Sequence, residues 1–585
     1  MAQEINRMRL IKLYSEGGIF DEIIFHDGVN LILGEKYDET TVQGRKTNGV
    51  GKSMSMECLD FCLLSDYAPS RIKRIPTDVL PVEENIMLDI EIGEVLVTIK
   101  RNRKNEATPI IIKQGKEVSF NKLDEARSYL SELVFNKLDG TKVPSFRGLL
   151  SILMRDERCE FTDILKCHDV KKSIPVDLTV HLYMLGISLE KYKQVLGTIK
   201  EIEKLKPVIS KNKKDLTADN TKKIADVKAE INSLDDELEK MEAAIESFRS
   251  NESFESMEKD LLELESLLEQ LRRKQKVLRY DYDKIKRMPK PESIDDEEIK
   301  LVYNQFKEDL GSAIIKSLNE VVGFKNKVES FQRMLVNQKA QELEVQLKEI
   351  AEQIRSLDEK YAEKLKIIDQ KGVLKSLKAS LKIYEAKKDE YAQVKFLYGE
   401  YEKNSKQKKA LGLRKSQEII EIDQLIESNE EMINDFITTL LNIHEDIMGN
   451  KECAFTIQTI DKAQSKTPVE ISLRIYDDGS HSVNRTKVFI YDMALLFNKY
   501  TRLRHPLFLV HDNIFDVDQD TLVQCLNYLN KQEEKYQDFQ YILTLNRDKI
   551  ENEERAELIE MDIDKHKVAM FTKDSKFLKK NYQEK

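Results

Sequence analysis

A glycine-rich segment near the amino terminus carries the residue types that bind phosphate. Residues 44–53 read GRKTNGVGKS and come after the apolar stretch NLILGE. Glycines let backbone N–H groups curl around phosphate oxygens, a lysine reaches the β- and γ-phosphates, and a serine binds Mg²⁺ at a helix start. The predicted nucleotide contacts are therefore Asn48, Gly49, Val50, Gly51, Lys52, Ser53 and Met54. One departure is Lys46, which stands where the usual pattern has a glycine, and a chance GKS in a glycine turn is the alternative.

A second motif lies near the carboxyl terminus, where residues 506–513 read PLFLVHDN. A carboxylate at the end of a buried strand anchors Mg²⁺ through its water shell. Buried strands often end in an acid, so this motif gains weight only together with the first. The pair predicts one site for ATP and Mg²⁺. Asp512 and Asn513 are its candidate catalytic residues, and Ser53 and Asp512 are its candidate metal ligands.

Strand and helix patterns at both ends of the chain indicate how these motifs are positioned. Short alternating or apolar strands occur between residues 9 and 34 and again between 86 and 113. The carboxyl-terminal part adds further strands, with helices through 485–501 and near 519–531. Apolar strands alternating with helices predict a parallel sheet covered on both faces. Residues 1–187 and 448–585 are thus predicted to form two halves of one α/β head.

The middle of the chain has a different pattern. No glycine occurs from 198 to 310, and Pro289 and Pro291 are the only prolines between 208 and 467. Apolar residues step by three and four from Ile224 to Phe248, and the step resumes from Met257 and again from Leu343. Such a period predicts coiled-coil arms at 188–285 and 336–447, with the apex at 286–335. Ordinary amphipathic helices in a bundle are the alternative.

Composition excludes several classes of protein. With 34% charged residues but only 20 glycines and 11 prolines in 585 residues, the chain is neither collagen-like nor all-β. It has no apolar run of about 18 residues, so we expect no membrane partner, and it has no hydrophobic signal core, which predicts a cytoplasmic protein. The six cysteines lack metal-ligand spacing and are expected to be buried and reduced. A net charge of −10 confines any nucleic-acid contact to local basic patches.

These motifs and this layout resemble the SMC/RecN-like coiled-coil ABC ATPases. The segments GVNLILGE, TNGVGKS, SFRGLLSILMRDE and HDNIFDVDQ look most like the SMC-like subunit of bacterial multi-gene defence systems of the Lamassu type. The resemblance implies a split ABC-type ATPase head of mixed sheet and helices, joined by a long antiparallel coiled coil. It also implies a homodimer through the heads that sandwiches ATP and Mg²⁺, double-stranded DNA as a partner, and separate effector, nuclease and accessory subunits.

The sequence departs from the family pattern in four places. Asn513 occupies the position of the glutamate that activates water, so hydrolysis is expected to be slow unless Asp516 or Asp518 assists. The segment GSHSVNR, residues 479–485, stands in place of the signature motif. There Ser482 or Asn484 is expected to cap the following helix, either meeting the γ-phosphate of the partner's nucleotide as well or binding no ligand. Asn546 replaces the switch histidine, and the Q-loop is expected near Arg155 and Asp156.

Clustered basic residues are candidates for DNA contacts. In the head they are Arg71, Lys73, Arg74, Lys100, Arg101, Arg103 and Lys104. On the first arm they are Arg272, Arg273, Lys274, Lys276 and Arg279. Such clusters contact phosphates in DNA-binding proteins, but they are also common on solvated helix faces.

Three functions follow from these observations. The first is an ATP-binding SMC-like protein that dimerises on ATP, senses or clamps DNA and gates an effector, expected to be a nuclease, in antiviral defence. The second is a DNA repair or loop-translocating ATPase with sustained hydrolysis. The third is a structural coiled-coil tether with a vestigial head. Whether the chain is an enzyme depends on what compensates for Asn513.

Overall fold

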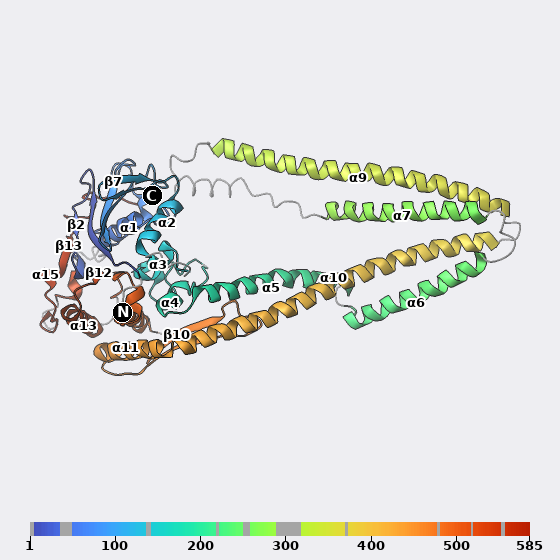
Figure 1. Ribbon diagram of the computed structural model, residues 1–585. Helices are drawn as coiled ribbons and strands as arrows, with labels where there is room; N and C mark the ends of the chain where they lie inside the picture. Colours follow the sequence, from blue (N-terminus) through green and yellow to red (C-terminus); the bar gives the residue numbers. More distant parts are fainter. Residues whose placement is uncertain are drawn as a thin grey trace, which may run out of the picture. The chain divides into compact units, whose positions relative to one another are not determined.

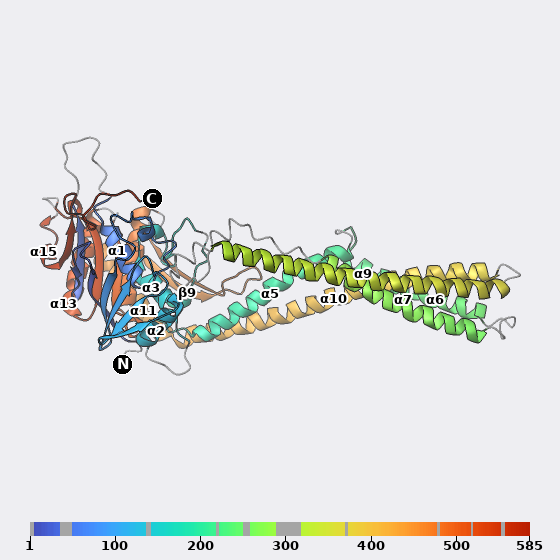
Figure 2. The ribbon, with the colours of Figure 1, turned by 90° about the horizontal axis from the view of Figure 1, so that it is seen from above.

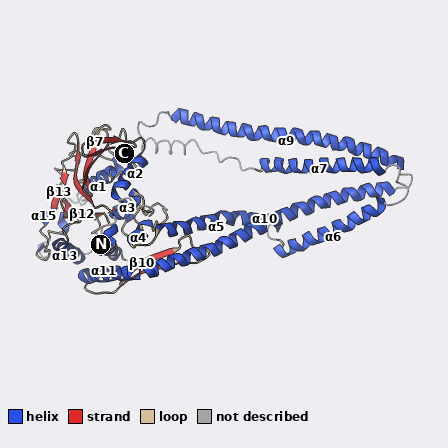
Figure 3. Cartoon of the chain, in the orientation of Figure 1, coloured by secondary structure: helices blue, strands red, loops and turns tan. Residues whose placement is uncertain are grey.

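The structure of the chain is a computed structural model, and Figure 1 shows its elements. It describes residues 5–35, 49–135, 142–172, 174–217, 221–249, 258–287, 318–368, 373–476, 480–515, 519–551 and 556–584. The chain divides into two compact units. The head unit contains residues 1–197 and 415–585, and the arm unit contains residues 198–299 and 317–414. All described strands belong to the head unit, as the colours of Figure 3 make clear.

A five-stranded parallel sheet forms the centre of the head, in the order β13-β3-β12-β11-β8. Its strands are β3 (Gly28–Gly34), β8 (Met154–Arg155), β11 (Phe508–Asp512), β12 (Gln540–Asn546) and β13 (Lys567–Phe571). β3 and β11 are buried along their whole length, which explains their continuous apolar sequence. Two strands come from the amino-terminal part and three from the carboxyl-terminal part. The predicted split α/β head is therefore confirmed.

Antiparallel strands complete the head. A six-stranded sheet has the order β2-β1-β4-β5-β6-β7, and β9 pairs with β10. The strands are β1 (Met8–Ser15), β2 (Ile23–Ile24), β4 (Ile86–Ile92), β5 (Val95–Arg101), β6 (Ile110–Lys113), β7 (Lys116–Ser119), β9 (Cys453–Thr459) and β10 (Val469–Ile475). Alternating buried and exposed residues in β10 place one face on the core and the other toward solvent.

Helices surround the parallel sheet. They are α1 (Lys52–Cys62), α2 (Leu123–Val134), α3 (Phe146–Leu153), α4 (Thr179–Met184), α11 (Glu430–Met448), α12 (His481–Phe497), α13 (Gln519–Lys535) and α15 (Ile563–His566). Short 3₁₀ helices lie at η1 (Arg71–Arg74), η2 (Glu157–Cys159), η5 (Thr501–Arg504) and η6 (Arg547–Lys549). The second half of α12, residues 488–497, is buried throughout and forms part of the core.

The arm unit contains two antiparallel helix pairs. α6 (Ile224–Arg249) packs on α10 (Val373–Ser428), and α7 (Glu258–Lys286) packs on α9 (Leu318–Ile368). Salt bridges fix the direction of α7 and α9, because Asp260 bonds Lys364 while Arg272 bonds Asp358. α5 (Leu189–Leu216) and α10 both continue into the head unit. The boundaries proposed for the arms and apex stay predictions, since residues 288–317 lie outside the described residues.

The two helix pairs of the arm unit also contact each other near the ends of α6 and α9 and the starts of α7 and α10, a region where the helices overlap in the view of Figure 2. Ile245 of α6, Leu268 of α7 and Tyr361 of α9 share one apolar cluster with side chains of α10. Arg272 bonds both Asp358 of α9 and Glu385 of α10. Each predicted arm therefore contains two successive helices that fold back on each other, α6 and α7 in the first and α9 and α10 in the second. The heptad pattern did not reveal this feature.

The fold-back can be tested by cross-linking. Lys276 of α7 bonds Asp389 of α10 at 2.5 Å, a contact that exists only if the two helix pairs pack together. A short bis-maleimide should therefore join the pair Lys276→Cys/Asp389→Cys within one chain. The control pair Asp260→Cys/Lys364→Cys reports only the pairing of α7 with α9. Cross-linking of the control pair alone, read as mobility on a denaturing gel, would contradict the fold-back.

Candidate functional site

The carboxyl ends of the parallel strands bring the two sequence motifs to one edge of the sheet. Gly34 at the end of β3 is in register with Asn546 at the end of β12, and Thr544 of β12 is in register with Asp512 of β11. Loops that follow the carboxyl ends of parallel strands are the usual ligand sites of α/β proteins. The glycine-rich loop and the acidic motif, predicted from opposite ends of the chain, thus lie at the same edge.

The glycine-rich loop leads into helix α1 through Gly51. Gly51 has a φ of 111°, and a β-carbon there would lie 2.4 Å from the β-carbon of Phe577. Only glycine fits both the backbone angle and the close approach. The carbonyl of Val50 accepts a hydrogen bond from the backbone N–H of Phe577 at 3.1 Å. Asn48 lies outside the described residues, and the side chain of Met54 is buried in the core.

Lys52 lies across the end of β3. A β-carbon at Gly34 would lie 2.6 Å from the Lys52 Nζ, so a larger residue there would displace the lysine side chain from this position. Its ammonium donates a hydrogen bond to Oδ1 of Asn546, the residue predicted in place of the switch histidine. Burial lowers the pKa of Lys52, and the carboxylates of Asp512 and Glu157 oppose that effect. The ammonium therefore has a hydrogen-bond acceptor, Asn546, at the predicted phosphate site.

Asp512 is a buried carboxylate at the end of β11. Only 3% of its surface is exposed, and burial raises its pKa to about 6 despite hydrogen bonds from Thr544 and Ser53. The Thr544 hydroxyl donates to Asp512 Oδ1 at 2.6 Å. Ser53 is the first-turn serine of α1, so the two predicted metal ligands are in direct contact. Buried carboxylates of this kind are normally compensated by a cation.

Asn513 follows Asp512 in a left-handed conformation, with a φ of 61°. Asparagine is among the few residues that adopt this conformation readily. Its backbone N–H donates to the Thr544 hydroxyl at 2.9 Å, and its carbonyl accepts from Arg485 at 2.7 Å. Its side-chain Nδ2 donates to Oε1 of Glu157 at 2.6 Å. The backbone of Asn513 is thus held on two sides while its amide is directed at a carboxylate.

Sequence reasoning did not identify Glu157. It is the first residue of η2, directly after β8, and β8 pairs in parallel with β11 so that Arg155 lies opposite His511. Two residues further along each strand, Glu157 and Asn513 come to the same level. The signal in the sequence was the acidic residue that directly follows the expected Q-loop position at Arg155 and Asp156.

The segment proposed as a signature motif begins helix α12. Its N-cap is Ser480, whose hydroxyl accepts from the backbone N–H of Val483 at 3.2 Å. The expectation that Ser482 or Asn484 caps the helix was wrong, because both lie inside the first turn. A nucleotide contact by either residue stays a prediction. Arg485, one residue further, connects this helix start to the backbone of Asn513.

A buried ion pair links the strands of the site to α12. Arg155 of β8 contacts Asp492 of α12 through two nitrogens, at 2.6 Å and 2.9 Å. His511 Nε2 donates to the same carboxylate at 3.0 Å, and His511 Nδ1 accepts from the hydroxyl of Tyr541 at 3.0 Å. Burial lowers the pKa of His511 and opposes ionisation of Asp492, yet Arg155 and His511 hold the pKa of Asp492 below its usual value. Arg155 is therefore a structural residue rather than a nucleotide contact.

The basic residues proposed for DNA differ in their surroundings. Arg101 is 1% exposed and donates to the carbonyls of Phe61, Ser65 and Glu106, so its assignment as a DNA contact was wrong. Arg103 likewise bonds backbone carbonyls of the head. Arg71 pairs with Glu584, Lys100 with Glu16 and Lys104 with Glu83. The exposed members of the cluster are Lys73, Arg74 and Lys104.

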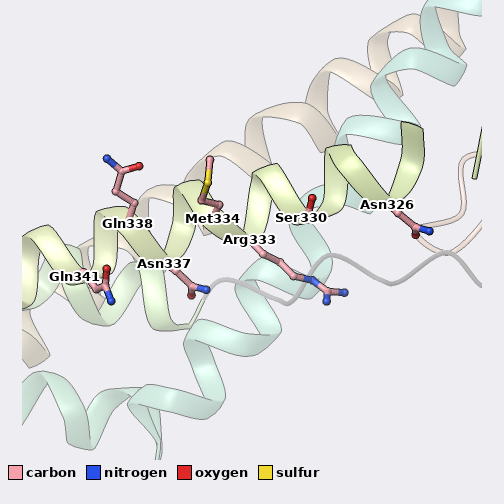
Figure 4. A pocket seen from close by; sticks show the side chains of 7 residues that line it. All are labelled: Asn326, Ser330, Arg333, Met334, Asn337, Gln338 and Gln341. Atoms are coloured by element: carbon pink, nitrogen blue, oxygen red, sulfur yellow. The ribbon is translucent and has the colours of Figure 1, made fainter. Parts of the chain in front are cut away.

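Other described parts of the chain were compared with this edge of the sheet as places for a ligand or a metal ion. Figure 4 shows a hollow on α9 lined by Asn326, Ser330, Arg333, Met334, Asn337, Gln338 and Gln341. All of its lining comes from one helix, so it does not enclose a ligand. Among the described residues, no group of three or more His, Cys, Asp or Glu could hold a metal ion. The six cysteines are free, as expected, and four of them are buried. No described helix is long and apolar enough to cross a membrane.

Comparisons with known proteins give remote similarities. Residues 443–581 match a family described as "Uncharacterised protein conserved in bacteria" (DUF2326). The uncharacterized protein YydD of Bacillus subtilis (strain 168) is 22% identical over 569 residues, which is 91% of each chain. The Smc head domain with a coiled coil and joint from Pyrococcus yayanosii has a TM-score of 0.32 and 13% identity over 93% of both chains. The Smc head with an extended coiled coil, bound to the C-terminal domain of ScpA, from Pyrococcus furiosus has a TM-score of 0.31 and 9% identity over 93% of this chain and 91% of that chain.

The buried ion pair of Arg155 and Asp492 is expected to contribute strongly to the thermal stability of the head. Replacing Asp492 with asparagine leaves Arg155 buried without a counter-charge, which typically costs about 3–5 kcal/mol. We therefore expect Asp492→Asn to lower the melting temperature of the head strongly in calorimetry. The control Glu83→Gln breaks the exposed pair with Lys104 and should leave the melting temperature unchanged. Equal melting temperatures for Asp492→Asn and the wild type would contradict the proposed role of the pair.

Proposed function

We propose that the head binds and hydrolyses ATP at the carboxyl edge of the parallel sheet. The observation that carries this proposal is the meeting of Lys52 and Ser53 with Asp512 and Asn546, residues from opposite ends of the chain. A lysine and a serine at the start of a helix after a glycine loop suit nucleotide phosphates, and a buried aspartate beside the serine suits Mg²⁺. The fold-level resemblance to SMC-like ATPases agrees with this assignment.

The residues at this edge fit both ATP and Mg²⁺. Lys52 already bonds an acceptor, Asn546 Oδ1, which phosphate oxygens would replace. The Ser53 hydroxyl and the Asp512 carboxylate are hard oxygen donors, the class that Mg²⁺ prefers. When bound, the metal would neutralise phosphate charge. It would also offset the burial that raises the pKa of Asp512. Lys52 would bind and orient the phosphates, and Asn546 would hold the lysine before the nucleotide arrives.

The wider role follows from the family resemblance. We propose that ATP brings two heads together, with the start of α12 at Ser482 and Asn484 facing the partner's nucleotide. Arg485 ties that helix start to Asn513 and so relates the head interface to the site. A head that closes on ATP would suit a DNA clamp that gates separate effector subunits in antiviral defence.

Nucleotide binding is tested with a phosphate-loop variant. Lys52→Ala removes the ammonium that pairs with phosphate, and we expect it to abolish ATP-dependent association of the chain in gel filtration with Mg²⁺. Wild type should elute earlier with ATP than without it. The control Lys73→Ala removes an exposed lysine from the same head and should behave like wild type. Wild type that neither binds a fluorescent ATP analogue nor changes its elution would contradict the proposal.

DNA binding is tested on the exposed part of the basic cluster. Each phosphate contact contributes about 0.9 to the slope of log affinity against log salt concentration. Lys73→Glu/Arg74→Glu should therefore weaken binding to duplex DNA and lower that slope by about 2 if both residues touch phosphate. The matched control, Lys116→Glu/Lys122→Glu, reverses two exposed charges outside the cluster. Equal slopes for both double variants, measured by fluorescence anisotropy, would contradict a role for Lys73 and Arg74.

A further inference from the structure

The site has a carboxylate where the sequence indicated that one is missing. In SMC-like ATPases a glutamate after the metal-binding aspartate activates water, and in this chain that residue is Asn513. Its amide donates to Glu157 Oε1 at 2.6 Å. The other oxygen of Glu157, Oε2, has no hydrogen-bond partner among the described residues and remains available. A carboxylate with one oxygen held and one available has the form of a general base.

Several contacts fix Glu157 in this position. It opens η2, whose N-cap Asp156 accepts from the backbone N–H of Arg158 at 2.9 Å. The Arg158 guanidinium bonds Asp156 and also approaches Glu57 at 3.4 Å. Glu57 belongs to α1, the helix that begins with Lys52. The segment that carries Glu157 is therefore tied both to strand β8 and to the helix of the phosphate-binding loop.

Strand pairing places Glu157 beside the acidic motif. Arg155 lies opposite His511, and two residues beyond each of them Glu157 is hydrogen-bonded to Asn513, the residue that follows Asp512. Glu157 therefore lies at the edge of the sheet where the nucleotide is proposed to bind. Glu157 is itself exposed. Water can therefore reach its available oxygen.

We propose that Glu157 is the general base of ATP hydrolysis and that Asn513 positions it. The oxygen of a water molecule forms a bond to the γ-phosphorus while the bond from the γ-phosphorus to the β–γ bridging oxygen breaks. ADP leaves with that electron pair, and the proton of the water passes to Glu157. In SMC-like ATPases the base follows the strand that carries the metal-binding aspartate, here β11. In this chain the proposed base follows the neighbouring strand β8. This inference rests on the proposed ATPase function. It adds the residue that accepts the proton of water during hydrolysis.

The backbone conformation at position 513 explains why asparagine, and not glutamate, follows Asp512. A residue at this position needs a positive φ, which asparagine accepts more readily than glutamate. Asn513 keeps the turn after β11, and its amide holds a carboxylate supplied by the adjacent strand. The same residue, Asn513, thus satisfies the backbone conformation after β11 and holds the proposed base.

The test compares Glu157→Gln with the wild-type chain. Glutamine keeps the size of the side chain and removes the base, so ATP binding should change less than about 3-fold while single-turnover hydrolysis falls by about 100-fold or more. Because ATP is not consumed, the associated form should persist in gel filtration. The matched control is Glu160→Gln in the same segment, an exposed residue that should retain wild-type hydrolysis.

The outcomes separate this inference from the function on which it rests. Wild type that fails to bind ATP overturns both. Wild type that binds ATP without turning it over overturns the role of Glu157 and the hydrolytic part of the proposed function, and leaves ATP binding intact. Glu157→Gln that hydrolyses ATP at the wild-type rate overturns the role of Glu157 alone. Glu157→Gln that loses ATP binding together with hydrolysis also argues against the role of Glu157, because it points to damaged structure at η2.

Discussion

Two opposite charges buried in the head hold its parts together. Arg155 and Asp492 are almost fully excluded from solvent, and each compensates the charge of the other. His511 completes the group by donating to the same carboxylate, and its neutral ring accepts from Tyr541. Since Arg155 lies on β8, Asp492 on α12 and His511 on β11, this one cluster fixes three elements. A buried pair of this kind is costly to break, so it specifies their relative position.

Each of those elements leads directly to the candidate site. His511 precedes Asp512, and Arg155 lies two residues before Glu157. α12 begins with the segment whose Arg485 holds the carbonyl of Asn513. A small shift of α12 relative to the sheet would therefore move the backbone of Asn513 and the carboxylate that it holds. This gives a physical route by which contacts at the start of α12, where a partner head is proposed to bind, would alter the site.

Sequence alone predicted the elements and two motifs, but not all of their relations. Strands such as β3 and β11 are recognisable because burial on both faces demands a continuous apolar run, and Gly51 and Lys52 follow a well-known spacing. Glu157 could not be found in this way. Its partner Asn513 is 356 residues away, and the two-residue strand β8 that aligns them is too short to leave a pattern. Arg101 was misassigned because its carbonyl acceptors depend on tertiary packing rather than on local sequence.

In the arms, too, the helices could be predicted from the sequence but their tertiary contacts could not. A stepping pattern of apolar residues predicts helices and their buried stripe, and both were found. The pattern does not specify which helix packs against the apolar stripe of another helix. The packing of the two helix pairs through Ile245, Leu268 and Tyr361 was therefore not predicted. Arg272 was considered as a phosphate contact, whereas its guanidinium bonds Asp358 and Glu385 within the unit.

The most direct measurement is an experimental structure of the full chain with Mg²⁺ and a slowly hydrolysed ATP analogue. Our account predicts that the Lys52 ammonium leaves Asn546 for the phosphates, that Ser53 and the water shell of Asp512 bind the metal, and that Glu157 contacts the water facing the γ-phosphate. Nucleotide bound away from Lys52 would contradict the account. A water molecule held in line with the γ-phosphate by residues other than Glu157 would contradict its central claim.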